Sequence, residues 1–221
     1  MSTTWWWARV PAVGELPGRL VFVHTDAHPD GTEVAWRSDD PVPTAADGAL
    51  GVVSFDDLGM PTNVELATER LAPKAPPLWF VEVRELTGQP PAVNLMAFTG
   101  YGIAAGRLLD DRAAIELGVE SADQTAAVRW YPATGEVDQI YVAPEWRRLG
   151  IATVLLHASA MLSVARGWQR FWGDGQRTAM GEAFRNASDW KHRGAELTHI
   201  APPMTPGEYA DGPVQERWIS G

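Results

Sequence analysis

The sequence predicts an α/β (α+β) fold in which a β-rich N-terminal extension precedes a domain that mixes strands and helices. Short apolar runs separated by turn-rich stretches fill the N-terminal third. From Ala126 onward, the hydrophobic pattern follows the order strand, strand, helix, strand, helix, strand. Three prolines lie within 71–77, and because proline breaks both helices and central strands, we place a boundary there. The predicted division is 1–77, 78–205 and a C-terminal tail at 206–221.

The composition excludes several classes of function. The chain has 221 residues, of which 45% are apolar and 21% charged, as is typical of globular proteins. It has no cysteine, which excludes disulfides, thiolate metal ligands and a thiol nucleophile. A net charge of −10 disfavours nucleic acid as a partner, because binding to a phosphate backbone relies on Lys and Arg. No apolar run is long enough to span a membrane and no signal peptide is evident, so we expect a cytoplasmic protein without a membrane partner.

The N-terminal extension shows strands but no motif that assigns it a role. Strands are predicted at Arg19–Val23 and Leu50–Phe55, between turn-rich stretches. The three tryptophans Trp5–Trp7 are expected to dock on the core, or on a second copy of the chain in a homodimer. The stretch His24–His28 holds two histidines and an aspartate, but we expect a loop there and no metal site.

The segment after the proline boundary gives weaker signals. Leu78–Leu86 alternates enough to predict a strand. Ala92–Asp110 is apolar and punctuated by glycines, and we expect it to be helical in part. A further strand is predicted at Ala113–Leu117.

A β-hairpin is predicted next, with strands at Ala126–Tyr131 and Glu136–Val142. The turn residues Pro132–Gly135 separate the two strands. Strict alternation predicts two faces on the second strand. One face would carry Val137, Gln139 and Tyr141, and the other Glu136, Asp138, Ile140 and Val142.

An amphipathic helix follows the hairpin. Its apolar residues share one helical face, and Gly167 ends it. We then expect a short strand at Trp168–Trp172, a second helix at Ala179–Trp190 and a last strand at Glu196–Ile200. The apolar positions of the first helix are Val154, Leu155, Ala158, Leu162 and Ala165.

The turn before this helix has the features of an anion site. Gly150 and the small Ala152 leave backbone N–H groups uncovered at a helix N-terminus, where the helix dipole favours a phosphate or pyrophosphate. Arg147 and Arg148 add positive charge beside it. Eight basic and five acidic residues lie within 141–200, which suits a small anionic ligand in an otherwise acidic chain. The alternative is an ordinary basic turn between a strand and a helix.

This turn resembles the signature of the GNAT superfamily of acyl-CoA-dependent N-acyltransferases. The family pattern [Q/R]-x-x-G-x-[G/A] reads here Arg147-x-x-Gly150-x-Ala152, after the frequent Val-x-Pro. With the flanking elements, the resemblance extends over about 78–200. It implies a GNAT-like central mixed sheet flanked by helices. It also implies transfer of an acetyl group from acetyl-CoA, or of another acyl group from its CoA thioester, to an amine. The acceptor would be a small molecule or a protein.

The resemblance also implies which residues bind the cofactor. Backbone amides from Arg148 to Thr153 would hold the pyrophosphate, and the end of the preceding strand would pair with pantetheine where it splays from its neighbour. A backbone N–H near Val142 would stabilise the oxyanion. The implied cofactor-binding residues are Ile140, Tyr141, Val142, Arg147, Arg148, Leu149, Gly150, Ile151, Ala152 and Thr153.

Two carboxylates are candidates for the catalytic base. Some family members use a Glu eleven residues before the first motif position, which here is Glu136. Asp138 is the second candidate, since neighbouring carboxylates raise one another's pKa toward the range of a base. The alternative is that both are solvated hairpin residues.

The general acid is where the sequence departs from the family. Many members have a Tyr in the second helix, four residues before a glycine. Here the residue four positions before Gly194 is Trp190, whose indole is not an acid. Trp190, with Trp168 and Trp172, is instead a candidate for stacking on the substrate. The departure leaves two alternatives open: a non-catalytic acyl-CoA-binding or interaction protein, and a GNAT-like enzyme that modifies nucleic acid.

Overall fold

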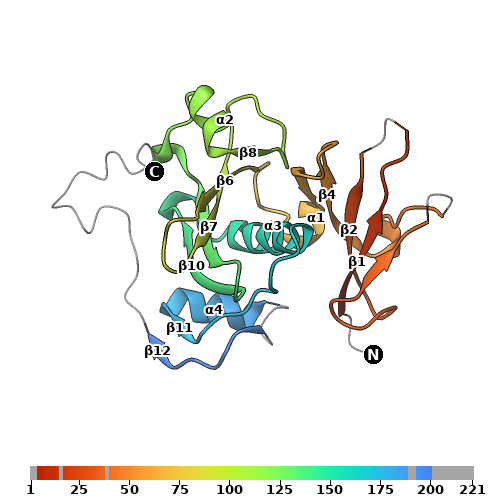
Figure 1. Ribbon diagram of the computed structural model, residues 1–221. Helices are drawn as coiled ribbons and strands as arrows, with labels where there is room; N and C mark the ends of the chain where they lie inside the picture. The colour runs from red at the N-terminus through yellow and green to blue at the C-terminus, as the bar shows by residue number, and fades with distance from the viewer. Residues whose placement is uncertain (1–3, 15–16, 38–39, 189–192, 201–221) are drawn as a thin grey trace.

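The computed structural model describes residues 4–14, 17–37, 40–188 and 193–200. Its centre is one long helix, α3 (Ile151–Ala165), which lies between two five-stranded sheets (Figure 1). Eleven of the fifteen residues of α3 are buried. A helix that is buried almost all round must pack on more than one side, and α3 contacts strands of both sheets.

The N-terminal sheet has the strand order β3-β1-β2-β4-β5. Neighbouring strands are antiparallel, except that β1 and β3 run parallel. The predicted strands in this part are confirmed as β2 and β4, and Trp5–Trp7 are buried within β1. The strands are β1 (Thr4–Val10), β2 (Arg19–Thr25), β3 (Glu33–Ala35), β4 (Ala49–Phe55) and β5 (Pro61–Leu66).

The second sheet has the strand order β10-β9-β7-β6-β8, and only β6 and β8 run parallel. The predicted strand after the prolines and both strands of the hairpin are confirmed as β6, β9 and β10. The strands are β6 (Trp79–Glu85), β7 (Ala92–Phe98), β8 (Leu108–Asp110), β9 (Ala126–Tyr131) and β10 (Glu136–Val142).

Two predictions in the middle of the chain are wrong. The apolar run expected to be partly helical begins with β7, a central strand covered on both faces, where apolar residues follow one another as they do in a helix. The strand expected at Ala113–Leu117 is instead part of helix α2 (Asp111–Glu116). Asp110 caps this helix, because its carboxylate accepts a hydrogen bond of 2.7 Å from the Ala113 N–H.

The short elements complete the chain. Helix α1 (Thr68–Leu71) leads into the residues 72–77, which we call the proline-rich linker. The predicted second helix is present as α4 (Ala179–Ala187), but it ends before Ser188 and is shorter than expected. The strand expected at Trp168–Trp172 is wrong as a regular strand, since only Trp172 forms a bridge there. Of the last predicted strand, only His199–Ile200 is a strand. The remaining elements are η1 (Ala45–Asp47), η2 (Ser121–Asp123), η3 (Pro144–Trp146), β11 (Gln176–Arg177) and β12 (His199–Ile200).

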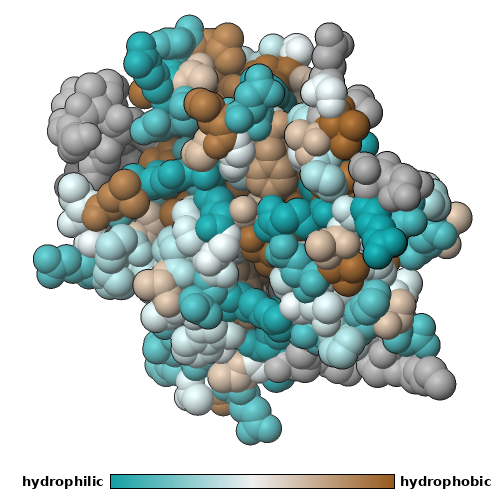
Figure 2. Space-filling view, turned by 45° about the vertical axis from the view of Figure 1, so that its right-hand side comes forward, coloured by the Kyte–Doolittle hydropathy of each residue, from teal (hydrophilic) through white to brown (hydrophobic). Residues whose placement is uncertain are grey.

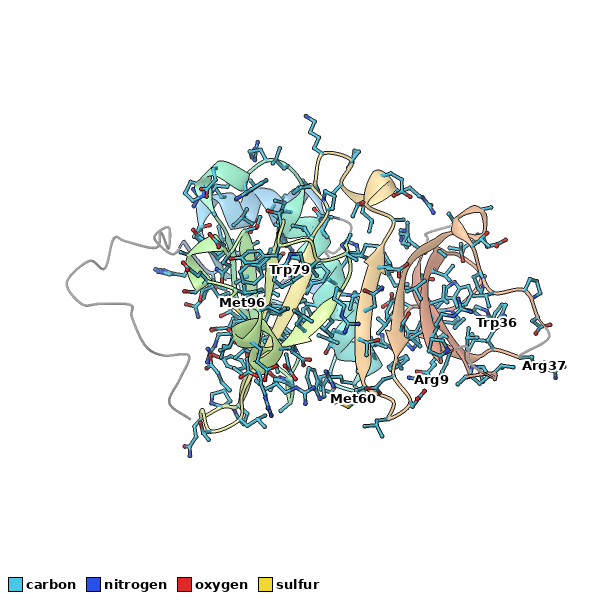
Figure 3. All side chains as sticks on the ribbon, turned by 90° about the horizontal axis from the view of Figure 1, so that it is seen from above. Arg9, Trp36, Arg37, Met60, Trp79 and Met96 are labelled. Atoms are coloured by element: carbon cyan, nitrogen blue, oxygen red, sulfur yellow. The ribbon has the colours of Figure 1, made fainter. Side chains whose placement is uncertain are left out.

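One hydrophobic cluster, which we call the main core, joins both sheets to α3. A second cluster, which includes Trp6, lies on the other face of the N-terminal sheet, and Trp36 packs against it (Figure 3). A third, containing Trp79 and Met96, lies on the face of the second sheet that carries α2 (Figure 3). The main core includes Trp7, Leu20, Phe22 and Val53 of the N-terminal sheet and Leu95, Val128 and Trp130 of the second.

The surface mixes hydrophilic and hydrophobic residues. On the face shown in Figure 2, hydrophobic residues are scattered among hydrophilic ones. None of the helices in the described ranges is long and apolar enough to cross a membrane.

Candidate functional site

The turn between β10 and α3 presents a row of backbone N–H groups. Arg148 and Gly150 both take left-handed conformations, with φ angles of 66° and 86°. The first helical hydrogen bond runs from the Val154 N–H to the Gly150 carbonyl, at 3.1 Å, and no side chain caps the helix. Within the described part of the chain, the N–H groups from Arg148 to Thr153 therefore have no acceptor. Such a row at a helix N-terminus, which we call the phosphate turn, is suited to an anion.

Charge around the phosphate turn is also positive. The Arg147 side chain folds back, and its Nε donates a hydrogen bond of 3.0 Å to the Val142 carbonyl at the end of β10. Arg148 is exposed, so its guanidinium is available to a ligand at the turn. Glu145 is the carboxylate within the turn, and it is exposed as well.

Gly150 is held in place by the proline-rich linker. A β-carbon built on Gly150 would lie 2.6 Å from the Ala72 Cβ and 3.3 Å from its Cα. Ala72 is itself buried, with 4% of its surface exposed. Two independent constraints therefore require glycine here: the positive φ and the close approach of Ala72. The sequence gives no sign of this second constraint, because the two residues are far apart in the chain.

The outer edge of β10 is paired over only part of its length. The Val137 N–H donates to the Trp172 carbonyl at 2.9 Å, and the Trp172 N–H donates to the Gly135 carbonyl at 3.0 Å. The next residue, Gly173, already pairs with the chain around Gly194 instead. In the described ranges no strand pairs with this edge beyond Val137. We call the resulting opening, which runs from Val137 toward Val142, the wedge.

A β-bulge at Asp138 changes which side chains share a face of β10. The register shifts between Val137 and Gln139, so one residue is extra on this strand. The predicted strict alternation is therefore wrong past Val137. The α3 side of β10 carries Val137, Ile140 and Val142, whose cross-strand partners Trp130, Val128 and Ala126 belong to the main core. The opposite side, which we call the outer face, carries Glu136, Gln139 and Tyr141, whose partners are Tyr131, Arg129 and Ala127.

The two candidate carboxylates have different surroundings. The Asp138 Oδ2 lies 3.3 Å from Arg129 Nε, and Arg129 also contacts Glu85 at 2.7 Å. Glu136 is half-buried and has no ion-pair partner among the residues that the structure describes. Asp138 thus belongs to a network of ion pairs that connects β10, β9 and β6, while Glu136 does not.

Two tyrosines of the hairpin remain protonated at neutral pH. Burial, followed by the charge of Asp138 and a hydrogen bond to it, raises the pKa of Tyr131. Burial also raises the pKa of Tyr141. Sequence reasoning missed Tyr131 and Arg129 as neighbours of the candidate bases. The four-residue turn contained the signal, because it places Tyr131 opposite Glu136.

The candidate tryptophans lie in different environments. Trp172 lies at the closed end of the wedge, 40% exposed, with its Nε1 donating to the Thr134 carbonyl at 3.0 Å. The Trp168 ring packs against Trp130 and lies within 5.8 Å of the guanidinium carbons of Arg84 and Arg166. Trp190 lies outside the described residues. The structure thus places Trp172 beside the wedge and Trp168 against the main core.

The histidine-rich stretch of the N-terminal extension lies elsewhere. His24, at the end of β2, stacks on Trp5 with ring centroids 4.6 Å apart. In the ranges the structure describes, no three His, Asp or Glu side chains come together in a way that could hold a metal ion.

Comparison with known proteins identifies the segment that contains the site. Residues 102–180 match the model of the acetyltransferase (GNAT) family. Neither the curated proteins nor the solved structures gave a match. The matched segment contains the hairpin, the phosphate turn and all of α3. The match supports the resemblance found in the sequence, over 79 of the 221 residues.

Proposed function

We propose that this protein is an N-acyltransferase that transfers an acetyl group from acetyl-CoA to an amine by direct attack. The observation that carries the proposal is the phosphate turn at the start of α3, next to a wedge in the sheet edge that leads away from it. The turn suits a pyrophosphate, and the wedge suits an extended chain with amide groups. Acetyl-CoA would supply the acyl group as an activated thioester.

This geometry supports a particular set of residues as the cofactor site. The N–H groups from Arg148 to Thr153 donate hydrogen bonds to the pyrophosphate, and the Arg148 guanidinium adds charge. The wedge edge of β10, from Ile140 to Val142, offers backbone groups to the pantetheine arm. A backbone N–H of this edge stabilises the oxyanion formed during attack.

Glu136 is the better candidate for the base. Its carboxylate lies at the closed end of the wedge, where β10 pairs with Trp172, and it is not neutralised by a described cation. It accepts the proton of the acceptor ammonium, directly or through water. Asp138 acts as a positioning residue, since its contacts with Arg129 and Tyr131 hold the bulge.

The charge of the outer face supports an amine acceptor. Three carboxylates and one guanidinium gather there, so the local charge is negative and favours a protonated amine. The Tyr131 and Tyr141 rings add surface against which the carbon chain of such a substrate can pack. The carboxylates are Glu85, Glu136 and Asp138, and the guanidinium is that of Arg129.

The first test is cofactor binding, measured as thermal unfolding with and without acetyl-CoA. A ligand at 100 times its Kd stabilises by ~2.7 kcal/mol, which for a chain of this size predicts a rise in Tm of roughly 5–10 °C. Arg148→Glu should abolish most of the shift while leaving the Tm of the free protein nearly unchanged, because Arg148 is exposed. Gly150→Glu is unsuitable, since it would also clash with Ala72. No shift in the wild-type protein would refute the proposal.

The second test is catalysis, measured as CoA release over a panel of amines. Glu136→Gln should lower kcat by about 10²–10⁴-fold. Asp138→Asn is the matched control, with the same charge change two residues away, and should lower kcat far less. Equal losses would refute the assignment of Glu136. Binding of acetyl-CoA without CoA release from any amine would favour a non-catalytic binding protein.

A further inference from the structure

The proline-rich linker lies directly on the phosphate turn, although it is outside the segment that matches the GNAT family. Ala72 packs against Gly150, and Leu71 and Ala75 pack against the main core on either side of it. The Ala75 N–H donates to the Ala72 carbonyl at 2.8 Å, which closes a turn with Pro73 and Lys74 at its tip. The tip is therefore next to the N-terminus of α3.

The position of this linker turn is fixed from the other side by the N-terminal sheet. Helix α1 precedes the turn and lies beside α3 and the N-terminal sheet (Figure 1). The Arg70 Nη1 donates to the carbonyls of Ala45 and Ala49 at 3.0 and 3.1 Å. The Ala72 N–H completes α1 by donating to the Thr68 carbonyl at 2.8 Å. The turn is thus attached to both sheets.

Lys74, at the tip, is a cation with no partner of its own. It is exposed, and in the described ranges it makes no ion pair or hydrogen bond. The chain has only two lysines among its 18 basic residues, so a lysine at this point is unusual for this sequence. Pro73 restricts the backbone before it, which limits the directions that the tip can take. The ammonium of a lysine on a flexible stem is suited to a phosphate at the neighbouring helix N-terminus.

We propose that Lys74 binds a phosphate group of the acyl-CoA cofactor, so that the N-terminal extension completes the cofactor site. The inference rests on the proposed function, since it assigns Lys74 to the ligand of the phosphate turn. The N–H groups of the phosphate turn and the Arg148 guanidinium bind the cofactor from the α3 side. Lys74 binds it from the linker, which packs against Gly150. The extension then has a role that the matched segment alone cannot supply.

Isothermal titration with CoA tests this inference. Lys74→Gln should raise the Kd for CoA by about 5–10-fold at low ionic strength, and the difference should shrink as salt is added. Lys74→Arg should bind nearly as the wild type does. The matched control is Arg112→Gln, which removes one exposed positive charge on α2, paired with Glu116, and should leave the Kd unchanged.

A second ligand, 3′-dephospho-CoA, shows which phosphate group Lys74 binds. Comparison of the variants then separates the role of Lys74 from the proposed function. If the loss for Lys74→Gln disappears with 3′-dephospho-CoA, Lys74 binds the 3′-phosphate; if it persists, Lys74 binds the pyrophosphate. An unchanged Kd for Lys74→Gln, together with weaker binding by Arg148→Glu, would overturn the role of Lys74 and leave the proposed function standing. No binding of CoA by the wild-type protein would overturn both.

Discussion

Glu82 of β6 and Arg166, just past the end of α3, form an ion pair inside the molecule across 84 residues of sequence. Their side chains are only 6% and 10% exposed. Burial lowers the pKa of Arg166, and the charge of Glu82 opposes this effect. The Arg84 Nε lies 3.0 Å from the Glu82 Oε1, so this one carboxylate forms ion pairs with two guanidinium groups.

Glu82→Gln should therefore lower the free energy of unfolding by about 3 kcal/mol, because it leaves a buried cation without its counter-charge. Urea denaturation at neutral pH measures this. Glu116→Gln is the control, because it breaks an ion pair whose side chains are 85% and 64% exposed and should cost less than about 0.5 kcal/mol. Equal effects for the two variants would contradict the prediction.

Gly150→Ala should destabilise the protein even without a ligand. A side chain at positive φ costs about 1–2 kcal/mol, and the overlap with Ala72 adds to this. Gly118→Ala is a matched control, since Gly118 has a φ of 69° but nothing within 4 Å of the added carbon. The difference between the two variants in urea denaturation reports the Ala72 contact, and Ala72→Gly should restore part of the loss in Gly150→Ala. No difference would mean that the linker yields to the added carbon.

Arg148→Gly should raise stability and weaken cofactor binding. Arg148 holds a φ of 66°, where glycine has no steric penalty, so the substitution should add about 0.5–1 kcal/mol even after the greater freedom of the unfolded chain is counted. It also removes the exposed guanidinium beside the phosphate turn. In urea denaturation of the free protein, the free energy of unfolding should therefore rise. In titration with CoA, the affinity should fall. A fall in stability would show that the Arg148 side chain stabilises the fold.

Glu33 makes the N-terminal sheet sensitive to acid. The hydrogen bond from Arg9 holds the pKa of Glu33 below its usual value, with a further hydrogen bond from the Trp7 Nε1. A lowered folded-state pKa gives stability that is present above the unfolded-state pKa and is lost as the pH falls through the folded-state value. Glu33→Gln should cost less than ~1 kcal/mol at neutral pH, because the carboxylate is 42% exposed. The cost should disappear as the pH falls through the lowered pKa of Glu33, and a cost that does not change with pH would contradict the prediction.

Local patterns in the sequence predicted the elements nearest the site. The turn residues at Pro132–Gly135 and the alternation around them predicted both strands of the hairpin with the bounds that the structure shows. The apolar spacing and Gly167 predicted α3. These signals suffice because hydrogen bonds between near neighbours determine a hairpin and a helix.

The parts that sequence reasoning missed depend on contacts between distant residues. The β7 run was ambiguous because a strand covered on both faces loses its alternation. The bulge at Asp138 has no local signature, and it decides which side chains of β10 lie on the outer face. The contact of Ala72 with Gly150 becomes visible only once the linker is folded onto the helix.

The position of α3 between two sheets has a consequence for any attempt to shorten the protein. The linker is rich in proline and partly exposed, so it resembles a site for proteolysis or for truncation of the chain. A chain that began at Leu78 would lose the N-terminal sheet. His157 and Met161 of α3, which now pack against Trp5 and β4, would then be exposed. We expect such a fragment to aggregate or to be digested, rather than to fold as a smaller version of this protein.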